Sequence, residues 1–427
     1  MPAIAIMKQF NNFQQYSICF FFPYHEVSGV PVLFSRMANT IIDQYPFIDV
    51  SIIDYNNGAI ARNFTSNDKV RIIEFKDGQR VSPPDDCVLI MQSILPYAMR
   101  PELLIKPKTK ILLWTLHPEN LVPILIPLPG LRNIQNHYFQ FYKTIASLFF
   151  RKRIKLCKEY IRIANIRKGL YFMDGPNFEK TIKYLFLDRF DVDFLPVPSV
   201  PSLFKEEKTI NTDVIYFCWV GRLCDFKSHI LIHTLKKLST IAAKTQKRIY
   251  YYVIGEGPFR ERISMLNIDN HYFKLDMKGP MTPDALDRFL ATEVNVLTAM
   301  GTSALEGAKL AIPTILLDIS YYPIKGDYLF RWLHDTKDYD LGHDISSKDY
   351  VENNSSLETM FLSLFEQYEE LSRKAFEYFK NNHDIGVTAR RLVSAIEHTN
   401  FAIENVPPYL LKRTFLRKLY DKMRGFN

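Results

Sequence analysis

The sequence has few cysteines, and none of them stands in a pattern typical of a metal site or a disulfide framework. The five are scattered and odd in number, with no CxxC pair and no zinc-like Cys/His spacing. They are Cys19, Cys87, Cys157, Cys218 and Cys224. Isolated cysteines behave as small apolar residues, so we expect a reducing compartment.

Long apolar runs are absent too. No uninterrupted stretch reaches the roughly 18 residues that span a bilayer, and the first residues lack the order of a signal peptide. Low-complexity tracts are missing, and the composition, 47% hydrophobic and 23% charged, is that of a folded protein. We therefore expect a cytoplasmic protein without a spanning helix.

Apolar runs alternate with helix-like segments along both halves of the chain. Residues 17–22 begin the first series and residues 214–220 the second, and the stretch between, 196–212, is rich in proline and then polar, as linkers are. At 427 residues, two domains are the default expectation. We predict an α/β fold of two doubly wound, Rossmann-like domains facing across a cleft, with domains at 1–200 and 213–400, a linker at 201–212 and a basic tail at 401–427.

Acidic residues are scarce between 143 and 168. That segment has nine basic residues against Glu159 alone, so it carries a charge of +8, which equals the formal charge of the whole chain. Apolar residues interleave with the basic ones, and a second basic amphipathic stretch spans 409–424. Such helices suit an anionic membrane surface, or they are ordinary surface helices with the apolar face on the core. Nucleic acid is not expected, because no helix-turn-helix, RNP, KH or zinc-finger signature accompanies the charge.

The stretch from 294 to 318 carries the clearest local pattern. It predicts a strand ending near Thr298, a turn at 300–302, a helix opening at Ser303 and a second strand after Pro313. Ligands of open α/β sheets bind at the carboxyl ends of strands, and free amides at a helix start favour phosphate. Glu306 could accept bonds from a diol. Alternatively, Ser303 and Glu306 form a capping box.

Two earlier stretches follow the same strand-and-turn plan. VGRLCDFKSH places Gly221, Arg222 and Lys227 after a strand, and YYVIGEGPF ends a strand in Gly255 and Gly257. In this order the three motifs resemble the family 4 nucleotide-sugar glycosyltransferases of the GT-B fold. The likeness runs from about 214 to 318. The first half agrees more loosely, through FPYHEVSGVPVLFSRMA and ILLWTLHPENL.

The resemblance implies a donor site that works without a metal or another cofactor. Arg222, Lys227 and the helix start would stabilise the charge of the leaving diphosphate. Glu306 matches the ribose-binding glutamate of the family, and Gly29 matches the glycine turn that faces the donor. The full set of donor-side residues is Gly29, Gly221, Arg222, Lys227, Gly255, Gly257, Gly301, Thr302, Ser303 and Glu306.

Two histidines enter through the same resemblance. His117 matches a histidine that contacts the donor sugar or the reacting groups, although a strand-end histidine can also cap the Pro-Glu-Asn turn that follows it. His25 and Glu26 would face the acceptor. The family retains anomeric configuration without an agreed protein nucleophile, so none is named.

The chain departs from the family at Thr298, where members often carry an acid near the donor sugar. The rival glycosyltransferase fold uses an Asp-x-Asp pair to hold a divalent cation, and two such pairs occur, at 191/193 and 338/340. With a strand-helix array in each half, a metal role for either pair is not expected.

Together these observations predict a retaining glycosyltransferase, peripheral at the inner face of the cell membrane. Its donor would be a nucleotide sugar and its acceptor a lipid-linked glycan in O-antigen or capsule assembly. Two alternatives stay open: a catalytically silent nucleotide-sugar-binding subunit, and a nucleotide-sugar epimerase of the same architecture.

Overall fold

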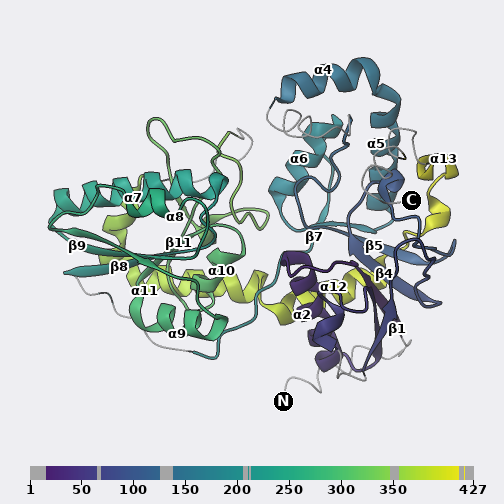
Figure 1. The fold of residues 1–427 in the computed structure, drawn as a ribbon, viewed down its shortest axis with the longest axis horizontal. Coiled ribbons are helices and arrows are strands. Elements are labelled where there is room, and N and C mark those ends of the chain that lie inside the picture. The colour runs from purple at the N-terminus through teal and green to yellow at the C-terminus, as the bar shows by residue number, and fades with distance from the viewer. Residues whose placement is uncertain are drawn as a thin grey trace. The chain divides into compact units, whose positions relative to one another are not determined.

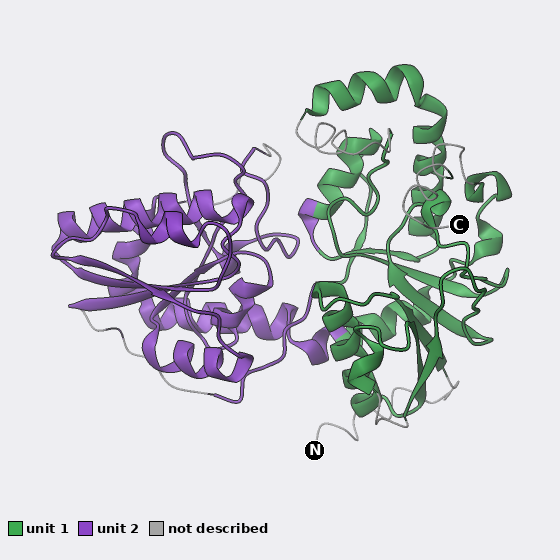
Figure 2. Ribbon diagram, in the orientation of Figure 1, with its two compact units in different colours: residues 1–173, 177–195, 389–427 green, residues 174–176, 196–388 purple. Residues whose placement is uncertain are grey.

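A computed structural model describes residues 16–64, 69–125, 138–204, 210, 213–346, 355–412 and 418. They form two compact units, each built on its own β-sheet (Figure 1 and Figure 2). Unit 1 comprises residues 1–173, 177–195 and 389–427, and unit 2 comprises residues 174–176 and 196–388. The predicted α/β fold class is confirmed.

Unit 1 contains a parallel sheet of seven strands in the order β3-β2-β1-β4-β5-β6-β7. The strands are β1 Tyr16–Phe21, β2 Ile48–Asp54, β3 Val70–Glu74, β4 Cys87–Gln92, β5 Lys110–Thr115, β6 Leu170–Phe172 and β7 Asp193–Phe194. Central strands of a parallel sheet are covered on both faces, which explains their continuous apolar runs. In β1, for example, Ile18, Cys19 and Phe20 have no exposed surface.

The helices of unit 1 come from both ends of the chain. They are α2 Gly29–Gln44, α4 Phe139–Phe149, α5 Arg151–Ile166, α6 Gly175–Leu185, α12 Ile385–His398 and α13 Pro408–Leu411, with the first residues of α6 and α12 counted in unit 2. The last segment is bonded into the sheet region, because the amide of Ile111 donates to the carbonyl of Phe401 at 2.7 Å. Gly169 leaves room for it, since a Cβ there would lie 2.3 Å from the Cβ of Phe401.

Unit 2 contains a six-stranded sheet in the order β10-β9-β8-β11-β12-β13, parallel except for β13. The strands are β8 Val214–Val220, β9 Arg248–Ile254, β10 Phe273–Lys278, β11 Val296–Ala299, β12 Thr314–Leu316 and β13 Arg331–Trp332. The helices are α7 Asp225–Thr245, α8 Arg260–Ser264, α9 Pro283–Glu293, α10 Thr302–Ala308 and α11 Leu357–Asn382.

Alternate residues of β8 pack into different layers of unit 2. Phe217 and Trp219 belong to the cluster that contains Leu231 of α7, whereas Cys218 belongs to the cluster that contains Leu290 of α9. This alternation is the two-residue period of a strand buried on both faces. Helices therefore cover both sides of the sheet, and its carboxyl edge is left for loops.

Within the described part of the chain, no helix has the length and apolar content needed to cross a bilayer.

Candidate functional site

The strand order of unit 2 reverses between β8 and β11. β8 leads to β9 on one side, and β11 leads to β12 on the other. Their carboxyl ends carry Gly221 with Arg222 and Met300 with Gly301, respectively. A reversal of this kind is where open α/β sheets bind ligands, because the two loops diverge and leave space at the sheet edge. The predicted donor residues of unit 2 thus converge on its topological switch point.

Lys227 is the half-buried cation of this edge. A Cβ on Gly221 would lie 3.7 Å from its ammonium nitrogen, so the ammonium lies beside the β8 loop. Burial lowers the pKa of Lys227, and nearby Arg222 lowers it further. No carboxylate among the described residues pairs with it, and the ring of Phe226 lies 5.9 Å away. An ammonium group without a counterion at a sheet edge is suited to bind an anion.

Gly255 and Gly257 fill a packing role. A Cβ on Gly255 would lie 2.1 Å from the carbonyl oxygen of Gly221, and one on Gly257 would lie 2.4 Å from that of Leu223. The amide of Leu223 also donates to Glu256 O at 2.9 Å. These glycines let the β9 loop lie directly against the β8 loop, whose backbone on either side of Arg222 they contact.

Gly301 makes the turn between β11 and α10. Its φ of +63° lies in the left-handed region, and a Cβ there would meet nothing within 4 Å. Its amide donates to Leu341 O at 2.6 Å. Helix α10 begins at Thr302, one residue earlier than predicted, and in the described structure the amides of Thr302 and Ser303 have no acceptor.

Glu306 does not cap its own helix. The N-cap of α10 is Gly301, with no side-chain capping bond, so the capping-box alternative is wrong. Instead, Glu306 Oε2 lies 2.5 Å from the ammonium of Lys309, which also lies 2.8 Å from Asp287 Oδ1 of α9. The pair orients the Glu306 carboxylate and leaves Oε1 without a bond to any described residue.

Thr298 is fully buried in β11. Its hydroxyl donates to the carbonyl of Cys218 at 3.2 Å and contacts the hydroxyl of Tyr251. The side chain at this position therefore joins the core between β11 and its neighbours. It offers no polar group to a ligand.

In unit 1, the predicted acceptor-side residues lie in the loop after β1. Asp54 anchors this loop by accepting from the amide of Tyr24 at 2.9 Å, and the ring of His25 stacks on Tyr55 at 4.0 Å. His25 and Glu26 are both exposed. Gly29 is the first residue of α2, and a Cβ there would meet nothing within 4 Å, so the protein itself does not require a glycine.

His117 follows β5 and is exposed. Its Nδ1 accepts from the amide of Glu119 at 3.2 Å, and its own amide donates to Asn120 Oδ1 at 2.9 Å. The turn-capping arrangement is therefore present. Because Nδ1 is an acceptor, the neutral ring carries its proton on Nε2.

Each Asp-x-Asp pair has a carboxylate bonded to a basic side chain. Asp193 pairs with Lys168 at 2.7 Å, and Asp340 pairs with Arg331 at 2.7 Å. In each pair, one of the two carboxylates is therefore held by a basic side chain of the protein.

Only some of the basic side chains of residues 143–168 are free to present charge at the surface. Lys158 donates to the carbonyl of Phe186, Arg153 lies over the ring of Tyr97 and Lys168 pairs with Asp193. The apolar side of α5 is buried in the core of unit 1. Seven basic residues are exposed, Lys168 included despite its ion pair: Lys143, Arg151, Lys152, Lys155, Arg162, Arg167 and Lys168. Of the stretch 409–424, residues 413–417 and 419–424 lie outside the described residues.

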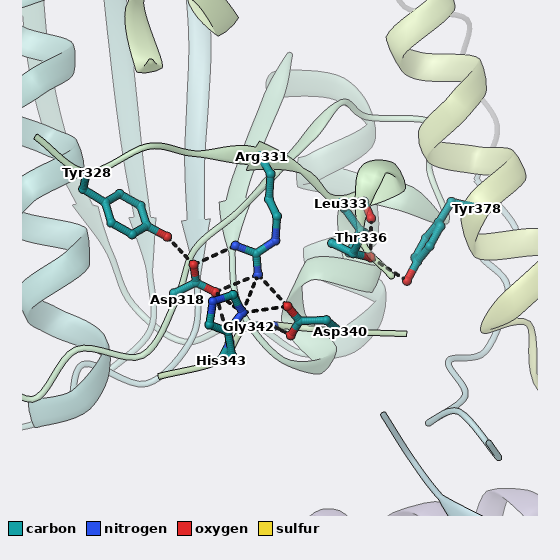
Figure 3. A network of polar contacts seen from close by, with 9 residues as sticks. All are labelled: Asp318, Tyr328, Arg331, Leu333, Thr336, Asp340, Gly342, His343 and Tyr378. Atoms are coloured by element: carbon teal, nitrogen blue, oxygen red, sulfur yellow. Dashed lines mark hydrogen bonds and ion pairs between the residues drawn. The ribbon is translucent and has the colours of Figure 1, made fainter. Parts of the chain in front are cut away.

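A buried polar cluster at the end of β12 was not predicted. It contains the buried side chains of Asp318, Arg331, Asp340 and His343, with the half-buried Tyr328 beside them (Figure 3). One feature of the sequence indicates such a cluster: Arg331 is a charged residue between Phe330 and Trp332 in an otherwise apolar run. A buried charge of this kind requires partners.

No protein-family model matches the sequence, and neither does any curated protein. Among solved structures, a glycosyltransferase from Rickettsia africae is similar with a TM-score of 0.54 and 12% identity, covering 90% of this chain and 98% of that one. The lipopolysaccharide outer core galactosyltransferase WaaB gives a TM-score of 0.51 and 12% identity, covering 89% and 99%. Both likenesses extend over nearly the whole of each chain. The protein therefore has the GT-B glycosyltransferase fold, as its three ordered motifs predicted.

Proposed function

We propose that the protein is a glycosyltransferase that uses a nucleotide-diphosphate sugar as donor and retains its anomeric configuration. The observation that carries this proposal is Lys227, a half-buried ammonium at the switch point of unit 2 that pairs with no carboxylate of the described residues. Arg222 and the free amides of Thr302 and Ser303 lie on the two loops of that edge. Such a set suits a diphosphate.

Transfer breaks the bond between the anomeric carbon and a diphosphate oxygen, and the oxygen keeps the electron pair. Negative charge on the diphosphate therefore increases toward the transition state, where Lys227 and Arg222 bind it more strongly than in the ground state. The acceptor hydroxyl oxygen forms the new bond to the anomeric carbon, and its proton passes to the departing diphosphate oxygen. Glu306, held by Lys309, would bind the ribose hydroxyls through Oε1.

Calorimetric titration with UDP-, GDP- and dTDP-sugars tests the donor site. We expect one nucleotide series to bind, and Lys227→Ala to weaken that binding at least tenfold, which corresponds to about 1.4 kcal/mol. Gly29→Ala tests the turn that faces the donor. The protein itself leaves space for the added Cβ, so weaker donor binding by this variant would indicate contact between the donor and Gly29. Equal donor binding by the wild type and Lys227→Ala would refute the site.

A lipid-linked glycan is the acceptor we favour, with the enzyme peripheral at the inner face of the cell membrane. The end of α4 exposes 69% of Leu148 and 76% of Phe149, directly before the basic start of α5 at Arg151, Lys152 and Lys155. Apolar side chains beside exposed cations suit an anionic bilayer.

Vesicle flotation tests this surface. The double variant Leu148→Glu with Phe149→Glu should lose binding to phosphatidylglycerol vesicles. Leu203→Glu is the matched control, since Leu203 is 98% exposed but lies in unit 2. Equal binding to phosphatidylglycerol and phosphatidylcholine vesicles would refute the membrane proposal.

A second candidate function is a subunit that binds nucleotide sugar without turnover. The observation that favours it is the burial of Thr298, which leaves no acid at the position where the family often has one. Donor binding without product, in the presence of crude lipid-linked glycan acceptors, would support this candidate.

A further inference from the structure

The buried cluster of unit 2 is built around Arg331 (Figure 3). Its guanidinium bonds both oxygens of Asp318 at 2.7 Å and Asp340 Oδ2 at 2.7 Å. Tyr328 donates its hydroxyl hydrogen to Asp318. The side chains of Arg331, Asp318 and Asp340 are at most 3% exposed, so the charges interact in a medium of low polarity.

His343 completes the cluster and determines its charge balance. Its Nδ1 lies 2.8 Å from Asp340 Oδ2 and 3.2 Å from Arg331 Nη2. A protonated ring donates to Asp340, and the two carboxylates then face two cations. A neutral ring leaves two carboxylates against one cation, whichever of its nitrogens keeps the proton. Burial alone would lower the pKa of His343, but the bond to Asp340 and the charges of both carboxylates raise it overall.

Two hydrogen bonds connect the cluster to the switch-point loops. Leu341 O, next to Asp340, accepts from the amide of Gly301 at 2.6 Å. The amide of Ser320, two residues after Asp318, donates to Phe226 O at 2.9 Å, directly before Lys227. The cluster therefore lies behind the Gly301 turn and the start of α7 together.

Further hydrogen bonds join the two segments that carry the cluster. Asp340 Oδ1 accepts from the amide of Gly342 at 2.7 Å, and Asp318 Oδ1 accepts from the amide of His343 at 3.0 Å. The amide of Ile319 donates to His343 O at 2.7 Å. Residues 318–320 and 340–343 are thus one bonded unit, so that a change at His343 reaches both loops.

A metal centre is the other reading of these side chains. One ligand atom from each of Asp318, Asp340 and His343 lies within 4.8 Å of the others. However, the guanidinium of Arg331 already bonds both carboxylates, so an incoming cation would meet its charge at contact distance. The arrangement therefore favours an ion-pair cluster.

We propose that this cluster is a positioning device for the donor site: with His343 protonated it holds the Lys227 and Gly301 loops together, and loss of that proton weakens binding of the nucleoside diphosphate. Among the described residues, the charged groups that act on His343 include Asp318, Asp340 and Arg331, and Tyr328 acts through Asp318. Deprotonation leaves the carboxylates of Asp318 and Asp340 to share the single charge of Arg331, so the cluster becomes net negative next to the carbonyl that holds Gly301. The inference rests on the proposed diphosphate site.

The test compares nucleotide affinity at two pH values in the full-length protein. UDP, GDP and dTDP are titrated in turn at about pH 6 and about pH 8, on either side of the usual histidine range. The variant is His343→Asn, whose amide can still donate to Asp340 but does not titrate. For the wild type we expect binding roughly threefold to tenfold weaker at the higher pH, which corresponds to about 0.6 to 1.4 kcal/mol.

The loss of affinity between the lower and the higher pH should be smaller in the variant than in the wild type by this factor. Ionisation of the diphosphate and of Lys227 contributes to both proteins and cancels in the comparison. Parallel pH profiles for the two proteins would overturn the inference while leaving the donor site intact. Absence of binding by all three nucleotides would refute the proposed function itself, and this inference with it.

Hydrogen exchange provides a readout that does not depend on a variant. Protection of the Gly301 and Ser320 amides in the wild type, corrected for intrinsic exchange, should fall between the lower and the higher pH. Unchanged protection at both amides would overturn the proposal. Thermal unfolding of His343→Asn confirms that the variant is folded.

Discussion

The ammonium nitrogen of Lys309 lies 2.5 Å from Glu306 Oε2, and 8% of the lysine side chain is exposed. The same nitrogen lies 2.8 Å from Asp287 Oδ1. A glutamate held by a buried cation keeps one orientation, and this orientation leaves its second oxygen for a ligand.

Lys309→Met should therefore reduce the preference for ribose. Hydrogen bonds to a charged group contribute about 1.5–3 kcal/mol, so the wild type should bind a ribonucleoside diphosphate more tightly than its 2′,3′-dideoxy form by about that amount. In Lys309→Met most of this difference should disappear. Asp287→Asn is the matched control, because it removes the other partner of Lys309 and leaves Glu306 paired. An unchanged ribose preference in Lys309→Met would contradict this role.

The two cations of the β8 loop should affect rate more than folding. Arg222→Ala and Lys227→Ala are each expected to cost on the order of 2 to 4 kcal/mol in transition-state stabilisation, as the loss of other preorganised charge donors does. Lys227→Ala should not lower the melting temperature, since no described carboxylate loses a partner. The measurement is kcat/KM for donor with thermal unfolding beside it. Near-normal kcat/KM in both variants would contradict the assignment.

Gly257→Ala should destabilise unit 2. Its φ is +152° and a Cβ would lie 2.4 Å from Leu223 O, so we expect a loss of roughly 1–3 kcal/mol in the free energy of unfolding. Gly279→Ala is the control, because a Cβ there meets nothing within 4 Å. Chemical denaturation measures both. Equal stability of the two variants would show that the loops do not pack as described.

Asp318 should make unit 2 sensitive to acid. Burial raises its pKa, but the bonds and charge of Arg331 outweigh burial and lower it overall. A carboxyl whose folded pKa is lowered adds stability above its unfolded value, near 3.9, and that stability is lost as pH falls through the folded value.

Asp318→Asn should therefore cost about 3–5 kcal/mol at neutral pH, the usual effect of breaking a buried ion pair, and progressively less in acid. Asp327→Asn is the control, since Asp327 pairs with Lys237 at the exposed surface. Denaturation at neutral and acidic pH measures both. A difference between the wild type and Asp318→Asn that does not shrink in acid would contradict the assigned pKa.

The layers of the fold could be predicted from the sequence because each buried strand is a continuous apolar run. The run at 214–220, for example, is β8 with the same bounds. β13 was missed because a strand of two residues is too short to show an apolar or alternating pattern. Its pairing with β12 depends on tertiary contacts. The return of residues 389–427 to unit 1 was missed for a similar reason, since Phe401 and Gly169 are in contact but far apart in the sequence.

Residue types and spacing located the candidate site, but not the partners within it. Glu306 with Ser303 has the spacing of a capping box, but Glu306 instead pairs with Lys309, a buried lysine that also pairs with Asp287 of α9. The aspartates 338 and 340 have the spacing of a metal motif, and Asp340 instead bonds Arg331. Such choices depend on which side chains are buried together, which local spacing does not show.

Donor turnover is the most direct test of the proposed activity. The purified full-length protein is incubated with the nucleotide sugar that binds best and with membrane extracts that contain lipid-linked glycans, and released nucleoside diphosphate and labelled glycan are quantified together. We expect equal amounts of both products from the wild type, and a decrease of at least thirtyfold in Lys227→Ala, which corresponds to about 2 kcal/mol. Absence of both products from the wild type, or equal rates in the variant, would contradict glycosyl transfer at this site.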